Sequence, residues 1–102
     1  MRIISGKFKG RKVGYNHLYN VRPTTDRTKE SLFNILDQYF FFDKICALDL
    51  FSGSGNISYE LASRGVKKIT SVEKNIKCVR FISTFSKSLD IKLNIINSNA
   101  FK

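Results

Sequence analysis

The segment ALDLFSGSGNISYELASRG, residues 47–65, limits the possible folds more than any other part of this sequence. It overlaps an apolar run over residues 45–51, passes through Gly53 and Gly55, and continues in a helical pattern over residues 55–64. Near-continuous apolar runs are typical of parallel strands covered on both faces, and glycine permits turns that other residues disfavour. The segment therefore predicts a buried strand, a glycine turn and a helix.

The same alternation continues toward the C-terminus. Residues 68–73 (KITSVE) predict a second strand and residues 91–97 a third. Between them, residues 75–89 predict a helix whose apolar positions are Ile76, Val79 and Ile82. Strand, helix, strand, helix and strand form half of a doubly wound α/β sheet, and 102 residues suffice for one small domain.

Another helix is predicted before the first strand, within RPTTDRTKESLFNILDQYF. Pro23 fixes the entry of the chain, and Thr24 or Thr25 can cap the first turn. The apolar residues follow a helical spacing and predict one helical stripe, formed by Leu32, Ile35, Leu36 and Tyr39. We place the domain boundary here, with a basic N-terminal arm over residues 1–22 and the α/β unit over residues 23–102.

Basic residues are concentrated near the N-terminus. The formal net charge is +10, and positions 1–30 hold eight basic and two acidic residues. Residues 1–13 alternate short apolar and basic residues, which predicts two short strands or an extended arm. The asymmetry favours a polyanionic partner, above all nucleic acid, over a merely solvated basic surface.

Several other classes are disfavoured. Cys46 and Cys78 are too few and too far apart for a metal motif, and Cys46, within an apolar run, is expected to be a buried thiol in a reduced, cytoplasmic setting. The N-terminus has no apolar core of signal-peptide length. Charged Asp43, Lys44 and Asp49 interrupt the longest apolar region, so we expect no membrane span.

The glycine turn indicates a ligand that contains a nucleoside. A bare backbone followed by a helix N-terminus suits a carboxylate or a phosphate. Glu73 ends the second strand twenty residues after Gly53, where a carboxylate can accept hydrogen bonds from both ribose hydroxyls. Ser58 replaces the third glycine of the dinucleotide fingerprint, which weakens an interpretation as an NAD site.

Asp49, four residues before Gly53, narrows the choice of ligand. A carboxylate would repel a pyrophosphate but attract the ammonium group of an amino acid. S-adenosylmethionine contains both a ribose and an α-amino acid, so the pattern favours this cofactor. The alternative is that Asp49 only caps the following loop and Glu73 is a solvated strand end.

The chain resembles a known family at these residues. MRIISGKFKGRKV, RPTTDRTKESLFNIL, LDLFSGSGNISYELASRG, VEKN and NSNAF are similar, in order and spacing, to the bacterial 16S rRNA guanine-N2-methyltransferases of the RsmD type. The resemblance implies a class I methyltransferase fold, S-adenosylmethionine as the cofactor, and a guanine amine in the RNA of the small ribosomal subunit as the substrate.

The resemblance also assigns roles to individual residues. The positions that match the cofactor pocket are Asp49, Phe51, Gly53, Gly55, Glu73, Asn99 and Thr24. Asn99 stands where related enzymes often place an aspartate against the adenine amine, and its amide oxygen can accept the same hydrogen bond. The positions expected to contact nucleic acid are Arg2, Lys7, Lys9, Arg11, Lys12 and Arg22.

One family motif is missing. The family carries (D/N)-P-P-(F/Y) at the end of its fourth strand to hold the target amine, whereas the only proline here is Pro23. We therefore expect a methyltransferase domain truncated to its first half, with no catalytic residue of its own, little activity alone and an exposed apolar face. A separately encoded C-terminal half is a possible partner. The alternatives are a non-catalytic remnant that binds nucleic acid or cofactor, and a fragment of a DNA methyltransferase.

Overall fold

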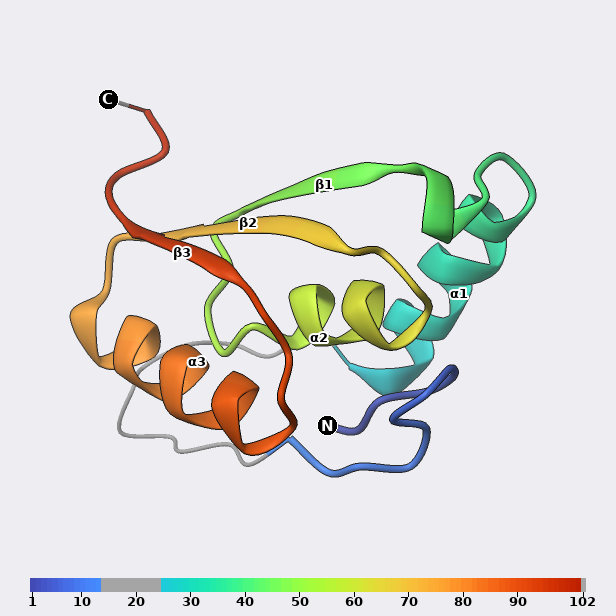
Figure 1. Cartoon of the computed structure of the whole chain (residues 1–102), viewed down its shortest axis with the longest axis horizontal. Helices are drawn as coiled ribbons and strands as arrows, with labels where there is room; N and C mark the ends of the chain where they lie inside the picture. The colour runs from blue at the N-terminus through green and yellow to red at the C-terminus, as the bar shows by residue number, and fades with distance from the viewer. Residues whose placement is uncertain (14–24, 102) are drawn as a thin grey trace.

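The computed structural model describes residues 1–13 and 25–101, and its regular core is a parallel sheet with helices on one face (Figure 1). The strands lie in the order β1-β2-β3, and both neighbouring pairs are parallel. In chain order the elements are α1 (Asp26–Asp37), the 3₁₀ turn η2 (Phe42–Lys44), β1 (Cys46–Leu50), α2 (Asn56–Ser63), β2 (Lys68–Glu73), α3 (Ile76–Ser88) and β3 (Asn94–Asn97).

The predicted alternation of strands and helices is confirmed, and most boundaries agree to within one or two residues. The third strand differs, because it begins at Asn94 and not at residue 91. The preceding residues instead close α3: the N–H of Ile91 donates to the carbonyl of Ser86 at 2.8 Å, and Asp90 takes a left-handed φ of 56°. This arrangement is a Schellman-type helix end, and it occupies residues that were expected to begin the strand.

Among residues 1–13 and 25–101, helices cover only one face of the sheet. Figure 1 shows α2 and α3 on the same side of the strands, and no helix of the described residues on the other side. On the open side, Leu48 is 63% and Ile96 41% exposed. The expectation that residues 45–51 are covered on both faces is therefore wrong for the described chain. Cys46 is also exposed and not the expected buried thiol, because it shares the open face with Leu48.

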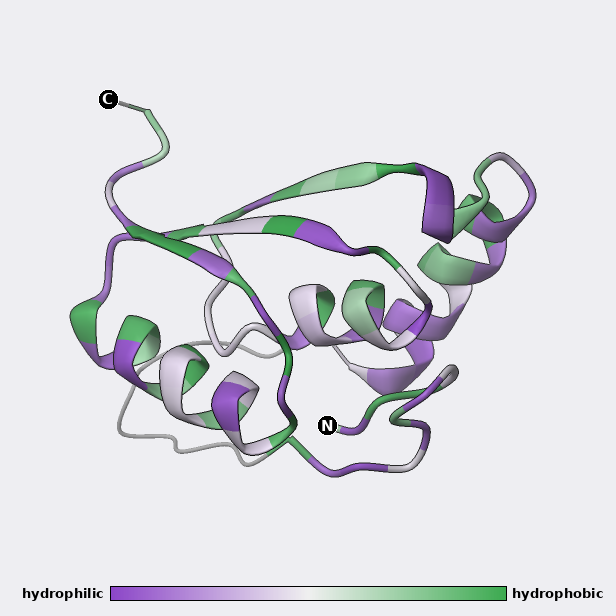
Figure 2. Ribbon diagram, in the orientation of Figure 1, coloured by the Kyte–Doolittle hydropathy of each residue, from purple (hydrophilic) through white to green (hydrophobic). Residues whose placement is uncertain are grey.

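The expectation of an exposed apolar face, by contrast, is confirmed. Figure 2 shows strongly hydrophobic residues along β1 and β3, the two outer strands of the sheet. The open face is apolar because these strands have the hydrophobic composition of strands that are covered on both faces. It is exposed because the described helices pack on the other face.

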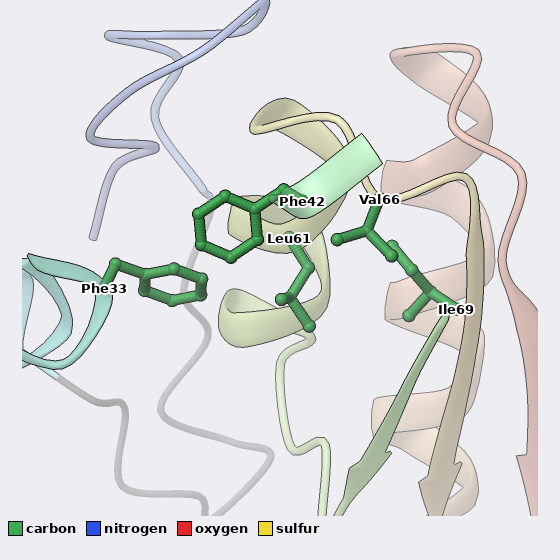
Figure 3. Close-up of a cluster of buried hydrophobic side chains, with 5 residues drawn as sticks. All are labelled: Phe33, Phe42, Leu61, Val66 and Ile69. Carbon is green, nitrogen blue, oxygen red and sulfur yellow. The ribbon is translucent and has the colours of Figure 1, made fainter. Parts of the chain in front are cut away.

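The main core lies where α1, η2, α2 and the start of β2 meet. Figure 3 shows five side chains from these elements and the α2–β2 turn pointing toward one another: Phe33, Phe42, Leu61, Val66 and Ile69. The rings of Phe33 and Phe42 lie 5.9 Å apart in a tilted arrangement. This cluster fixes α2, and with it the end of the glycine turn, against the sheet.

Helix α1 begins as expected but buries a different face. Thr25 is the N-cap, and its side chain accepts from the N–H of Thr28 at 3.2 Å. The buried residues are Lys29 and Phe33. The apolar stripe itself is largely open to solvent, because Leu32, Ile35 and Tyr39 are 41%, 56% and 74% exposed. Spacing identified an apolar side of the helix but not the side that packs in this chain.

The N-terminal residues fold back on themselves and pack against the α/β unit. Arg2 and Lys12 form an antiparallel bridge, and the N–H of Ile3 donates to the carbonyl of Arg11 at 2.9 Å. Ile3 and Val13 are buried in a second cluster with Tyr59 and Ile82. Residues 1–13 thus form a short hairpin that shares its apolar side with α2 and α3 and leaves its basic side chains outside.

Candidate functional site

The glycine turn joins the carboxyl end of β1 to α2. Three residues in it have left-handed backbones, with φ of 58° at Phe51, 57° at Gly53 and 86° at Gly55. Gly55 is the N-cap of α2 and supplies no capping side chain. A Cβ built at Gly53 would meet nothing within 4 Å, so this part of the backbone is open to an approaching molecule. The turn therefore offers bare main chain next to a helix N-terminus.

Glu73 holds this turn in place from the end of β2. Its Oε1 accepts from the N–H of Gly53 at 2.9 Å, and its Oε2 accepts from the N–H of Asn75 at 2.8 Å. Glu73 is only 8% exposed. An ionised carboxylate has about four acceptor positions, so each oxygen keeps capacity for a further donor such as a ribose hydroxyl. The alternative of a solvated strand end does not fit this burial.

Asp49 lies on the same face of the sheet, at the carboxyl end of β1. Its Oδ2 accepts from the hydroxyl of Ser58 at 2.6 Å, and that hydroxyl also lies 2.6 Å from Ser71 Oγ. Burial raises the pKa of Asp49, and the charge of Glu73 raises it further against the opposing hydrogen bonds. Two carboxylates near one bare turn create a negative field that suits a ligand with a cationic group.

The raised pKa of Asp49 gives a pH test. Binding of an ammonium-bearing ligand needs ionised Asp49. As the pH is lowered, the affinity should therefore begin to fall at a pH above the usual pKa of an aspartate, about 3.9. Stability should respond oppositely: a raised folded-state pKa costs stability above that pKa, and the cost disappears as the pH falls through it. We expect Asp49→Asn to bind S-adenosylhomocysteine more weakly than wild type at pH 7 and to lose this pH dependence in calorimetry. Equal pH profiles for the two proteins would contradict this role.

Two aromatic rings lie beside the turn, one of which the sequence analysis missed. The rings of Phe51 and Phe101 are 5.2 Å apart, and the residues are 57% and 86% exposed. Asn99 positions the second ring, because its Oδ1 accepts from the N–H of Phe101 at 2.9 Å. The NSNAF motif contains Phe101, but the resemblance assigns a role only to Asn99 within it. Exposed aromatic faces next to a nucleoside site can pack against a flat base.

The other predicted residues lie elsewhere. Thr24 and Arg22 fall outside the described residues. Four basic residues of the hairpin are exposed: Lys7, Lys9, Arg11 and Lys12. Arg2 is also exposed, and its Nε lies 3.7 Å from Asp26 Oδ2. Within residues 1–13 and 25–101 no cluster of His, Cys, Asp or Glu side chains could hold a metal ion, and no helix has the length and apolar character to cross a bilayer.

A buried ionic cluster links the hairpin to the helix that follows the glycine turn. Lys29 and Glu60 are fully buried, with Nζ and Oε1 3.2 Å apart. Glu60 also accepts from Arg64 Nε at 2.8 Å and from the N–H of Ile4 at 2.8 Å, and Lys29 donates to Asn56 Oδ1 at 2.7 Å. No sequence pattern predicts this cluster, since lysine and glutamate on helices are usually surface residues.

The pKa values within the cluster shift in a consistent way. Burial lowers the pKa of Lys29 more than the charge of Glu60 raises it. Burial alone would raise the pKa of Glu60, but the Ile4 N–H, Arg64 and Lys29 outweigh it and leave the pKa below its usual range. Because Lys29 reaches Asn56, the first residue of α2, this cluster supports the base of the glycine turn.

The residues around the turn have the chemistry that S-adenosylmethionine would require. Glu73 keeps acceptor capacity that a ribose could use, and the uncapped N-terminus of α2 would suit the carboxylate of the amino acid. Asp49 would supply a charge for the ammonium group, and the Phe51 and Phe101 rings would offer flat apolar surface to the adenine. No single group here is specific to one ligand, but the set matches the parts of this molecule.

Comparisons with known proteins agree with this fold. The chain is 44% identical over 73 residues to ribosomal RNA small subunit methyltransferase D of Haemophilus influenzae, covering 72% of this chain and 37% of that protein. It is 35% identical over 104 residues to the protein of the same name from Escherichia coli, covering 98% and 50%. The chain thus spans about half the length, or less, of these relatives.

A solved structure places the similarity in three dimensions. The protein yhhF of Escherichia coli, named as a methyltransferase, superposes with a TM-score of 0.84 at 32% identity, covering 98% of this chain and 53% of that one. The expected Rossmann-like methyltransferase fold, truncated relative to these proteins, is therefore confirmed. The family described as conserved hypothetical protein 95 matches residues 1–102. The chain therefore belongs to this family, and its resemblance to the small-subunit rRNA methyltransferases of the RsmD type is confirmed.

Proposed function

We propose that this chain is the donor-binding half of an S-adenosylmethionine-dependent methyltransferase that acts on the N2 amine of a guanine in 16S rRNA. The main support is the junction of Asp49 and Glu73 with the open backbone at Gly53. The names of the relatives support ribosomal RNA of the small subunit as the substrate.

The residues of this chain bind and orient the donor. Glu73 accepts hydrogen bonds from the ribose hydroxyls while it keeps its hydrogen bond from the N–H of Gly53. The same carboxylate therefore binds both the ligand and the turn. Asp49, braced by Ser58, attracts the ammonium group. Asn99 and the paired rings of Phe51 and Phe101 hold the adenine. The bound donor supplies an electrophilic methyl group, and the rate of its transfer depends on alignment with the attacking amine.

The acceptor side of the site is proposed to come from the second half of the relatives. This chain spans about half of their length, and it lacks the (D/N)-P-P-(F/Y) motif, since its only proline is Pro23. The apolar open face of the sheet, which includes Leu48 and Ile96, offers a surface against which further helices can pack. The basic hairpin contributes attraction for RNA phosphates.

A fusion of residues 1–102 to the second half of the Escherichia coli relative tests this function. With labelled S-adenosylmethionine and either 16S rRNA or DNA as the acceptor, the fusion should transfer methyl groups to the rRNA, where they appear as N2-methylguanosine after digestion. The 102-residue chain alone should transfer little, and a Glu73→Ala fusion should be strongly impaired at limiting donor. Robust turnover by the 102-residue chain alone would contradict the division into two halves, and label only in DNA would favour the DNA methyltransferase.

A further inference from the structure

A basic hollow lies at the opposite edge of the sheet from the glycine turn. It is a cavity of about 210 Å³ bordered by three lysines, Lys7, Lys67 and Lys92. Lys7 comes from the hairpin, Lys67 precedes β2, and Lys92 precedes β3. Lys67 and Lys92 lie close together because the amino ends of the parallel strands β2 and β3 meet at one edge, and the hairpin brings Lys7 to the same edge.

The charges around the hollow are not neutralised internally. All three lysines are exposed, and among the described residues none of them forms an ion pair. Lys7 Nζ lies 5.4 Å from the centre of the Phe8 ring, which adds a weak cation–π contact. Asp90 is the one acidic residue that lines the cavity, so the hollow keeps a net positive charge.

The floor of the hollow strengthens its field. It consists of apolar groups from the hairpin, α2 and the strand entries, namely Phe8, Ala62, Val66 and Ile91. Val66 is 4% and Ile91 9% exposed, so these groups form part of the molecular interior. A low-dielectric floor focuses the field of rim charges outward and raises the local concentration of anions.

We propose that the basic hollow binds the phosphate backbone of the RNA substrate, as a second contact away from the donor site. This inference rests on the proposed function. β2 has six residues, so the hollow and Glu73 lie about 20 Å apart along the sheet. Phosphates follow one another every few ångströms along an RNA strand, so one RNA molecule several nucleotides long can contact both edges.

The test compares matched double variants in RNA binding at about 50–200 mM salt, with 16S rRNA as the probe. Lys67→Gln/Lys92→Gln should weaken binding about fivefold at low salt and reduce the slope of log K against log[salt] by about 1.4. The control, Lys44→Gln/Arg80→Gln, removes the same charge from exposed positions outside the hollow and should change the slope little. Asp90→Asn should strengthen binding, because it removes the acidic charge from the lining of the hollow. The variant should fold normally, since asparagine tolerates the left-handed backbone at this position.

The outcomes separate this inference from the proposed function. If wild type binds RNA and the two double variants lose equal affinity and slope, the basic hollow is not a site and only general charge matters. If wild type binds no RNA while it still binds S-adenosylhomocysteine, the RNA part of the proposed function fails together with the hollow. Melting temperatures should agree among the variants, because all substituted lysines and Arg80 are exposed.

Discussion

Glu60→Ala is expected to lower the free energy of unfolding by about 3–5 kcal/mol, a large share of the stability of a domain of this size. Glu60 is fully buried and holds four partners: Lys29 and Arg64 through their cationic groups, and Ile4 and Ser5 through their backbone N–H groups. Removing it leaves a buried lysine without its counter-ion and two amides without an acceptor. Urea denaturation followed by circular dichroism measures the loss.

Two further variants make this prediction specific. Glu30→Ala, on the exposed side of α1, should cost less than about 0.5 kcal/mol. Lys29→Met combined with Glu60→Ala should recover part of the loss, because no buried charge is then left unpaired. A loss below about 1 kcal/mol for Glu60→Ala alone would show that the cluster does not stabilise the fold as its contacts indicate.

The pH dependence of stability should carry the signature of the same cluster. A folded-state pKa of Glu60 below its unfolded value contributes stability at any pH above the unfolded value, about 4.3. That contribution is lost as the pH falls through the lowered value. Wild type should therefore lose stability toward acid more steeply than Glu60→Ala does.

Gly55→Ala is expected to cost about 2–4 kcal/mol of stability and to abolish donor binding. A Cβ at this position would lie 2.6 Å from both Cζ and the hydroxyl oxygen of Tyr59, and the residue has a φ of 86°. Tyr59 cannot withdraw, because it is fully buried and its ring lies 4.8 Å from that of Phe85. The turn would have to move away from Glu73.

Gly53→Ala is the matched control within the same turn. Its φ of 57° is also left-handed, but a Cβ there meets nothing within 4 Å. Only the backbone cost of about 1 kcal/mol should appear in thermal denaturation. If the two substitutions destabilised the protein equally, the packing of Tyr59 beneath Gly55 would not be what requires glycine there.

The sequence predicted the features that depend on local chemistry. The glycine turn and the strand of residues 68–73 follow from backbone preferences and short-range patterns. It did not predict which faces are buried. Leu48 and Ile35 carry apolar side chains in the right periodic positions, yet both are exposed, because burial depends on what packs against each face. Pattern alone cannot specify that neighbour.

The candidate site shows the same division. Asp49 and Glu73 are predicted from their spacing to Gly53 at the ends of two expected strands, and the structure places both at the turn. Phe101 was missed, since a lone aromatic residue after a strand gives no spacing signal. Lys29 and Glu60 were missed because each looks like a surface residue until the hairpin covers them.

The most direct test of the central claim is calorimetric titration of the chain with S-adenosylhomocysteine, alongside its Glu73→Ala variant. We predict saturable binding by wild type and binding about 10- to 100-fold weaker by the variant, the scale of about 1.5–3 kcal/mol for hydrogen bonds to a charged group. The claim would be contradicted if folded wild type gave no binding heat at about 1 mM ligand, which would mean a binding free energy weaker than about 4 kcal/mol. Equal affinities of the two proteins would contradict it as well.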